Sequence, residues 1–272
     1  EYMQQAYFEK EFCIFTSDGC EFNCSFCGAH KNRKETFRDP IAFRKEMATR
    51  GKMIAKYAGP NPDYEIYLST LDGLQTWTTM EGVLEIIHDE FNKAGVFVPL
   101  RFLATSKYTF RALAADPDIL KRWKELGVMC IGMGIDGDDE KTWSMLRKNH
   151  NRRGEIEQAI IGVIDAGIIA EAFMIFGGPE ESREATLKAV EASKRLTEQG
   201  VKVRPYFMKM RSPKLTTKHT KENEVFYIEP FLKNIDLFYH LEYAMLGSEL
   251  TNEEVQQRKF ANREYRKLIK WL

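Results

Sequence analysis

Six short apolar runs, each followed by a segment of helical periodicity, constrain the fold of this chain more than any other feature. Most runs are continuously apolar or have one polar face, which is typical of buried parallel strands. Alternating strands and helices predict right-handed crossovers in a doubly wound sheet or a barrel, and the pattern alone does not separate these. The runs are Glu11–Thr16, Tyr64–Thr70, Pro99–Thr105, Val128–Ile135, Ile169–Phe176 and Val201–Met208.

The segments between these runs carry signals for the starts and ends of helices. Asp39 before Pro40 places a capping side chain ahead of a proline at the first helical position. Ser182 is expected to cap a later helix. After about residue 212 the sequence turns polar and then reads as helices rich in aromatic and charged residues. The sequence therefore predicts an α/β domain over residues 1–212 and a C-terminal helical extension over 213–272.

Composition narrows the classes of protein to which the chain can belong. Its 272 residues include 40 basic and 40 acidic side chains, so net charge steers it toward neither nucleic acid nor an anionic membrane. No apolar stretch is long enough to span a bilayer and no signal peptide is present, so we expect a cytoplasmic protein with no membrane partner. The chain begins at Glu1 rather than Met, as a fragment of a longer protein would.

Cys20, Cys24 and Cys27 form a compact C-x3-C-x2-C run directly after the first predicted strand, with Phe26 before the last cysteine. Three thiolates this close can hold three corners of a cubic iron–sulfur cluster and leave the fourth iron open. Soft thiolates favour iron–sulfur or zinc over hard cations, and an open position distinguishes a reactive metal site from a structural one. We expect Phe26 and Phe22 to shield the thiolates.

Two other readings of the cysteines stay open at this point. His30 follows the triplet at a usable distance, so a structural Cys3His zinc site is an alternative. A disulfide is less favoured, because five is an odd number of cysteines. The remaining two, Cys13 and Cys130, lie in predicted strands and are expected to be small buried hydrophobes.

The triplet, together with Phe26, resembles the signature of the radical S-adenosylmethionine (SAM) enzymes. In that family the fold is a partial (β/α)6 TIM-like barrel with its cluster loop after the first strand, and SAM chelates the fourth iron. Other segments resemble the cobalamin-associated and methylthiotransferase-like branch of the family. These segments are Ile14–Cys20, Gly132–Gly137, Leu146–His150 and Phe173–Glu181.

The chain departs from the family pattern at three points. Leu71-Asp72-Gly73 occupies the place of the glycine-glycine-glutamate motif that often follows the second strand. Asp136 stands where glutamate is usual, which shortens the reach of the carboxylate. No cobalamin-binding domain precedes the barrel within these residues, so methyl transfer is left unproven.

The resemblance implies a role in binding SAM for several residues besides the cysteines. Asp72, with Gly73, would meet the ammonium group and Asp136 the ribose hydroxyls. Lys148 would pair with the SAM carboxylate. The adenine would lie against the backbone of Phe26, Gly177 and Gly178. Each also has a plainer explanation: Asp72 and the glycines as turn residues, Asp136 as a helix cap, Lys148 as a solvated lysine and Phe26 as core packing.

The resemblance implies an enzyme in which a reduced 4Fe–4S cluster donates one electron to SAM. The resulting 5′-deoxyadenosyl radical would abstract hydrogen from a substrate carbon. The branch suggests methyl or methylthio transfer or a biosynthetic rearrangement, cobalamin as a further cofactor, and a donor such as flavodoxin or ferredoxin. The substrate, whether small molecule, peptide or RNA, is left open. The alternative is a non-catalytic, zinc-stabilised α/β binding module.

Overall fold

The computed structural model describes residues 2–10, 12–29, 32–176 and 182–207 of the chain. The chain divides into two compact units. The first comprises Glu1–Glu21, Asn32–Met133 and Gly154–Ala170, and the second comprises Phe22–Lys31, Gly134–Arg153 and Glu171–Leu272. The helical extension predicted over residues 213–272 lies outside the described residues, so that prediction stays a prediction.

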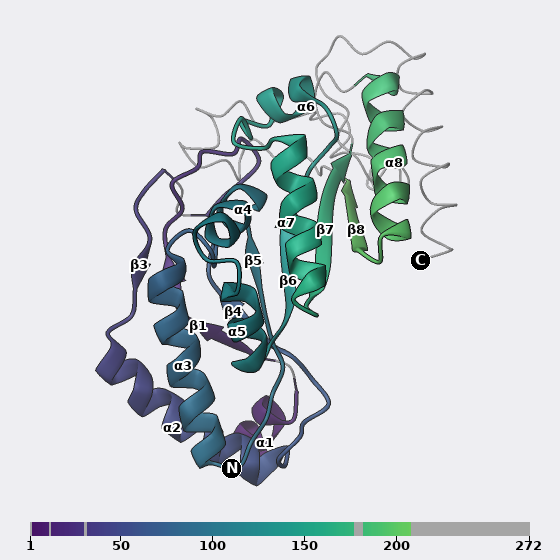
Figure 1. The fold of residues 1–272 in the computed structure, drawn as a ribbon. Helices are drawn as coiled ribbons and strands as arrows, with labels where there is room; N and C mark the ends of the chain where they lie inside the picture. Colours follow the sequence, from purple (N-terminus) through teal and green to yellow (C-terminus); the bar gives the residue numbers. More distant parts are fainter. Residues whose placement is uncertain (1, 11, 30–31, 177–181, 208–272) are drawn as a thin grey trace, which may run out of the picture. The chain divides into compact units, whose positions relative to one another are not determined.

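Strands and helices alternate along the described chain (Figure 1). The strands are β1 (Cys13–Phe15), β2 (Ser17–Asp18), β3 (Thr36–Phe37), β4 (Ile66–Ser69), β5 (Leu100–Ala104), β6 (Val128–Gly134), β7 (Ile169–Phe176) and β8 (Lys202–Phe207). The helices are α1 (Tyr2–Phe8), α2 (Pro40–Tyr57), α3 (Trp77–Lys93), α4 (Ser106–Ala115), α5 (Ile119–Glu125), α6 (Glu140–Met145), α7 (Arg153–Asp165) and α8 (Arg183–Glu198).

The long strands form the parallel arrangement that the alternation predicts, in the order β1-β4-β5-β6 in the first unit and β7-β8 in the second. In the first unit β1 pairs with β4, β4 with β5 and β5 with β6, and in the second unit β7 pairs with β8, all in parallel. Each of the six predicted apolar runs contains one of these strands. The predicted α/β class is therefore confirmed.

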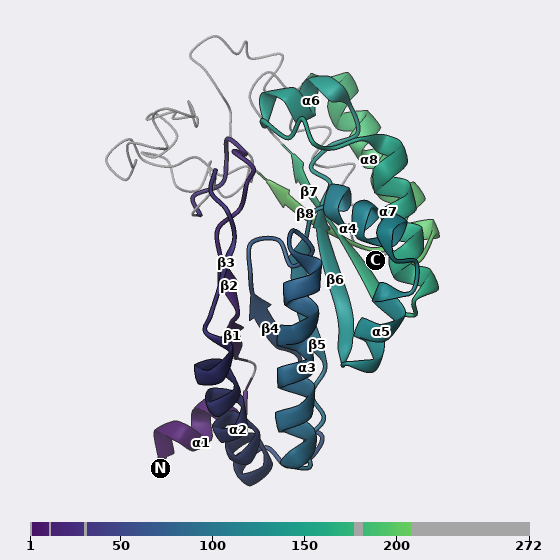
Figure 2. The same ribbon diagram turned by 60° about the vertical axis from the view of Figure 1, so that its left-hand side comes forward.

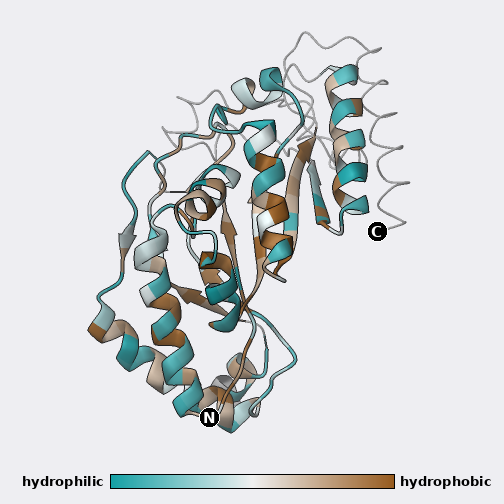
Figure 3. Ribbon diagram, viewed as in Figure 1, coloured by the Kyte–Doolittle hydropathy of each residue, from teal (hydrophilic) through white to brown (hydrophobic). Residues whose placement is uncertain are grey.

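The core of the first unit lies where its strands meet their helices. Along β4 and β5 alternate residues are buried, as the period of two requires, and Phe102 packs edge-on against the fully buried Trp123 of α5. Helices α2 and α3 run side by side (Figures 1 and 2). The strands are largely hydrophobic, whereas the helices carry both apolar and polar faces (Figure 3).

The helix starts follow the predicted caps. The Asp39 carboxylate accepts a hydrogen bond from the backbone N–H of Ala42 at 2.8 Å, and Pro40 begins α2. In the second unit the Ser182 hydroxyl accepts from the backbone N–H of Ala185 at 3.1 Å and caps α8. Both side chains satisfy N–H groups that have no partner within the helix.

The prediction that both strand cysteines are buried is right for Cys130 and wrong for Cys13. Cys130 is 2% exposed within β6, whereas Cys13 is exposed. The reason is that β1 alternates: Ile14 points to the core, while Cys13 and Phe15 lie on the opposite face, where Phe15 is 50% exposed. An apolar run alone does not tell a strand buried on both faces from a strand buried on one.

Strands β2 and β3 form a short antiparallel ribbon that the sequence did not predict, with Ser17 opposite Phe37. They flank the cysteine loop, and their arms approach closely at Gly19. Its φ is +104°, and a Cβ atom there would lie 2.5 Å from the carbonyl oxygen of Lys34. Glycine is required at this position for both reasons, and the close approach fixes where the arm that follows the cysteines runs.

Gly73 gives a stability test of this packing. A Cβ atom there would lie 2.4 Å from the ring of the buried Phe102. We expect Gly73→Ala to lower the free energy of unfolding by about 1–3 kcal/mol. The matched control is Gly82→Ala within α3, where an added Cβ meets nothing within 4 Å. That variant should be stabilised by about 0.5–1 kcal/mol. Urea unfolding measures both, and equal stabilities would contradict the packing.

Candidate active site

Polar side chains gather in the first unit where its parallel strands end. The Ser17 hydroxyl, just beyond β1, donates to Glu35 Oε1 at 2.7 Å and lies 2.9 Å from the hydroxyl of Thr70, which follows β4. Thr70 also donates to Glu35 Oε1 at 3.2 Å. Because the carboxyl ends of parallel strands meet at one edge of a sheet, this edge is where a ligand would be bound.

Glu35 is the buried charge of this edge. It is 6% exposed, and its second oxygen, Oε2, has no hydrogen-bond partner among the described residues. Burial raises the pKa of Glu35, and the hydrogen bonds from the Ser17 and Thr70 hydroxyls, together with the nearby Thr76 hydroxyl, oppose that rise. An unpartnered carboxylate oxygen away from water is costly, so this atom is a candidate ligand contact.

Asp72 is fully buried and already occupied by protein donors. Its Oδ1 accepts from the backbone N–H of Thr105 at 3.1 Å and of Leu74 at 3.3 Å. Its Oδ2 accepts from the Thr105 hydroxyl at 2.7 Å. Burial raises the pKa of Asp72 to about 7, the donors oppose the rise, and the nearby charge of Glu35 adds to it. In this structure Asp72 joins the ends of β4 and β5.

The cysteine loop is anchored in the second unit beyond Cys20. The Ser25 N–H donates to the carbonyl oxygen of Leu146 at 2.9 Å, and the Cys27 N–H donates to the Cys24 carbonyl oxygen at 3.2 Å. Phe26 is half-buried, and Phe22 stacks on the ring of His150 at a centroid distance of 3.8 Å. Both aromatic side chains predicted to shield the thiolates are thus half-buried, and the shielding itself stays a prediction.

The three predicted ligand cysteines are half-buried, which shields a thiolate while leaving it reachable. Among the residues that the structure describes, no group of three His, Cys, Asp or Glu side chains lies close enough together to hold one metal ion. His30, the fourth ligand of the zinc alternative, lies outside the described residues. The donor set fits an iron–sulfur cluster, since three thiolates supply soft ligands for three separate irons.

Asp136 and Lys148 form a buried ion pair in the second unit. The Lys148 Nζ lies 2.5 Å from Asp136 Oδ2 and also donates to the carbonyl oxygen of Gly134 at 2.6 Å. The two residues are 3% and 4% exposed. The plainer explanations, a helix cap for Asp136 and a solvated side chain for Lys148, are not what the structure shows, because Asp139 caps α6.

The segment after β6 is held in a specific conformation around this pair. Asp136 has a φ of +51°, which few non-glycine residues adopt. The carbonyl oxygen of Ile135 accepts from Trp143 Nε1 at 2.8 Å and from Asn151 Nδ2 at 2.9 Å. A buried pair on a fixed backbone presents its polar atoms in one arrangement.

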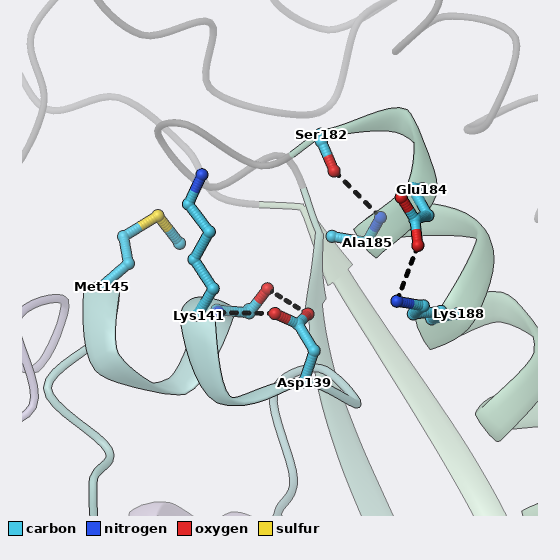
Figure 4. Close-up of a pocket in the computed structure, with 8 residues that line it drawn as sticks. Asp139, Lys141, Met145, Ser182, Glu184, Ala185 and Lys188 are labelled. Carbon is cyan, nitrogen blue, oxygen red and sulfur yellow. Dashed lines mark hydrogen bonds and ion pairs between the residues drawn. The ribbon is translucent and has the colours of Figure 1, made fainter.

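A pocket of about 240 Å³ in the second unit lies between α6 and the start of α8 (Figure 4). Its polar lining pairs internally: Glu184 with Lys188 at 2.8 Å, and Asp139 with the backbone and hydroxyl of Thr142. None of the predicted SAM-binding residues that the structure describes lines this pocket. Gly177 and Gly178, which were predicted to approach the adenine, lie outside the described residues.

Sequence reasoning missed Glu35, Ser17 and Thr70. A signal was present for the hydroxyls, because β1, β4 and β5 each end in a pair of them: Thr16-Ser17, Ser69-Thr70 and Thr105-Ser106. No sequence signal distinguished Glu35 from other acids, since its burial depends on the unpredicted ribbon of β2 and β3.

The family model for the radical SAM superfamily matches residues 14–193, about two thirds of the chain. The chain belongs to the radical SAM superfamily. SAM and a 4Fe–4S cluster are therefore its cofactors, and it belongs to a class of enzymes. The zinc-stabilised, non-catalytic module predicted as the alternative does not agree with this membership.

Solved structures with a similar fold include the radical SAM methyltransferase TsrM from Kitasatospora setae, at a TM-score of 0.56 and 13% identity over 97% of this chain and 53% of that chain. For the cobalamin-dependent enzyme OxsB, the TM-score is 0.55 and the identity is 13%, over 95% of this chain and 36% of OxsB. For coproporphyrinogen III oxidase (HemN) from Escherichia coli, the TM-score is 0.52 and the identity is 13%, over 87% of this chain and 54% of HemN. These likenesses confirm the partial TIM-like barrel, and the chain spans about half the length of TsrM and HemN.

A search of curated proteins found no match. No helix in the described part of the chain is both long and apolar enough to cross a bilayer.

The raised pKa of Asp72 predicts a pH dependence. Folded Asp72 keeps its proton up to its raised pKa of about 7, whereas the unfolded side chain loses it near the ordinary aspartate pKa of 3.8. Folding therefore takes up a proton between these values, so this contribution to stability is present at low pH and is lost as pH rises from about 4 to 7. The slope is about 1.4 kcal/mol per pH unit.

Urea unfolding between pH 4 and 8 compares the wild type with Asp72→Asn, whose amide can still accept from the backbone and donate to Thr105. The difference in unfolding free energy should change across that window, because all other titrating groups are shared. Parallel curves for the two proteins would contradict the assignment.

The buried pair predicts a coupled effect on stability. We expect Asp136→Asn and Lys148→Met each to cost about 3–5 kcal/mol, because each strands a buried charge. The double variant should cost clearly less than the sum, since it strands neither. Thermal and urea unfolding measure all four proteins. Additive costs would show that the two charges do not depend on each other.

Proposed function

We propose that the chain is a SAM-cleaving radical enzyme that activates a substrate C–H bond for methyl or methylthio transfer or for a related biosynthetic rearrangement. The observation that carries this proposal is the cysteine triplet within the matched family segment, on half-buried positions in a loop that also holds the half-buried Phe22 and Phe26. When bound, the cluster supplies the electron that splits SAM into methionine and a 5′-deoxyadenosyl radical.

The side chains of Cys20, Cys24 and Cys27 would hold the cluster as thiolates. Phe26 and Phe22 would keep water from the thiolates, which lowers the dielectric around the site. The hydrogen bond from Ser25 to Leu146 holds the loop against the C-terminal end of α6, so the cysteines that flank Ser25 start from a fixed backbone.

The remaining site residues would bind and orient SAM. Asp136 and Lys148, as a preorganised pair, would present a carboxylate to the ribose and an ammonium to the SAM carboxylate. The backbones of Phe26, Gly177 and Gly178 would contact the adenine. Asp72 and Gly73 were predicted at the amino end of SAM. Asp72 would act there by fixing the ends of β4 and β5, and Gly73 by allowing Phe102 to pack.

The branch assignment rests on likeness to TsrM and OxsB, both cobalamin enzymes by name. We propose cobalamin as a further cofactor, supplied by a domain or protein additional to these residues. The reductant would be a flavodoxin or ferredoxin, and the substrate a small molecule, a peptide or an RNA.

The test is anaerobic reconstitution of the full chain with iron and sulfide. The wild type should turn brown, contain about four irons per chain and form 5′-deoxyadenosine from SAM under a strong reductant. Replacing Cys20, Cys24 and Cys27 together with alanine should abolish all three properties.

His30→Ala serves as the matched control, because it removes a metal-ligating residue from the same loop. It should keep the wild-type iron content, whereas a zinc site would lose metal. A full cluster in the triple variant, or no deoxyadenosine from the loaded wild type, would contradict the proposal.

A further inference from the structure

The strand-end edge of the first unit holds two buried carboxyl groups, Glu35 and Asp72, and the charge of Glu35 raises the pKa of Asp72. Within the described residues no Lys, Arg or His nitrogen pairs with Glu35, and the groups that act on it are hydroxyls. Arg33, two residues before it, lies 3.7 Å from Asp18 instead. Among the described residues, no protein cation is therefore paired with Glu35.

Glu90, another buried acid of the same unit, does have cationic partners. Glu90, 7% exposed, receives Arg44 at 2.8 Å and Lys93 at 2.6 Å. A buried charge is costly without a partner, so the unpaired Oε2 of Glu35 indicates a position at which a ligand would supply that partner. A second unpaired buried atom, the Ser106 hydroxyl, follows β5 at the same edge of the sheet.

Asp72 and Glu35 differ in what they have left to offer a ligand. Both oxygens of Asp72 accept hydrogen bonds from Thr105 and Leu74, so a ligand would have to displace protein donors to reach it. Glu35 keeps Oε1 fixed by Ser17 and Thr70, while its buried Oε2 has no hydrogen-bond partner among the described residues. An acid held by one oxygen and unpartnered at the other is preorganised to accept a hydrogen bond from a ligand.

We infer that Glu35, and not Asp72, is the residue that accepts a hydrogen bond from the amino group of SAM in this chain. The inference rests on the proposed function, because SAM is the ligand that supplies this amino group. Glu35 reaches this edge through the ribbon of β2 and β3, where the close approach of the arms at Gly19 sets the course of the backbone. The arm after the cysteines thereby replaces the glutamate missing from the segment after the second long strand, where Leu71-Asp72-Gly73 stands.

The experiment measures SAM affinity by anaerobic calorimetry on the cluster-loaded full chain. Glu35→Gln keeps the shape and can still accept from Ser17 and Thr70, but loses the charge. We expect it to bind SAM about 10- to 100-fold more weakly, with iron content unchanged. The matched control is Glu90→Gln, also a buried glutamate of the first unit, which should keep wild-type SAM affinity and unfold at a lower temperature.

Two further readouts separate ligand binding from a structural role. Without SAM, Glu35→Gln should melt at or above the wild-type temperature, because it removes an unpaired buried charge. A SAM analogue lacking the amino group should bind more weakly than SAM to both proteins, but the loss should be smaller in Glu35→Gln. Thr70→Val, which removes one donor to Oε1, should weaken SAM binding without loss of iron and serves if Glu35→Gln fails to fold.

Two results would overturn the assignment: wild-type SAM affinity in Glu35→Gln, or an equal loss for the deaminated analogue in both proteins. A loss of amino-group selectivity in Asp72→Asn but not in Glu35→Gln would return the role to Asp72. No SAM binding by the loaded wild type would instead refute the proposed function itself, so the two failures are distinguishable.

Discussion

A carboxylate that is buried at the carboxyl edge of a parallel sheet needs a partner, and the structure of the first unit depends on how that need is met. Parallel strands deliver their ends to one edge, and in this chain hydroxyl-bearing residues lie at or directly after the ends of β1, β4 and β5. The hydroxyls satisfy one oxygen of Glu35 and one oxygen of Asp72. Backbone N–H groups complete Asp72, and nothing in the described protein completes Glu35.

The second unit meets the same need internally. Asp136 and Lys148 neutralise each other, and Lys148 also reaches the carbonyl oxygen of Gly134. Replacing Gly134 with any other residue would place a Cβ atom 2.8 Å from Lys148 Nζ, so the glycine is part of the arrangement. A pair that is already satisfied can orient a ligand through hydrogen bonds at little cost. An unsatisfied charge gains its partner only when a cation binds.

Much of the fold could be predicted from the sequence because hydrophobic period and capping residues are local signals. The strands β4 to β8 fall inside the predicted runs, and Asp39 and Ser182 cap the helices that follow them. What could not be predicted depends on tertiary placement. The exposure of Cys13 follows from which face of β1 meets the core, and the burial of Glu35 follows from a two-residue ribbon too short for any periodic signal.

The candidate site shows the same division. The cysteine triplet is a spacing, which a sequence displays directly, whereas the roles of Asp72, Asp136 and Lys148 depend on which neighbours already occupy their polar atoms. Family likeness placed Asp72 and Asp136 after the second and fourth long strands, where the structure has them. It could not show that Lys148 and Asp136 pair with each other. Nor could it show that Glu35, an acid outside the expected motif, has a carboxylate oxygen without a hydrogen-bond partner among the described residues.

The most direct test of this account is a structure of the anaerobic, cluster-loaded chain with SAM bound. The account predicts that the amino nitrogen of SAM lies within hydrogen-bonding distance of Glu35 Oε2, while Asp72 keeps its bonds to Thr105 and Leu74. An amino group on Asp72, with Glu35 still unpartnered, would contradict it.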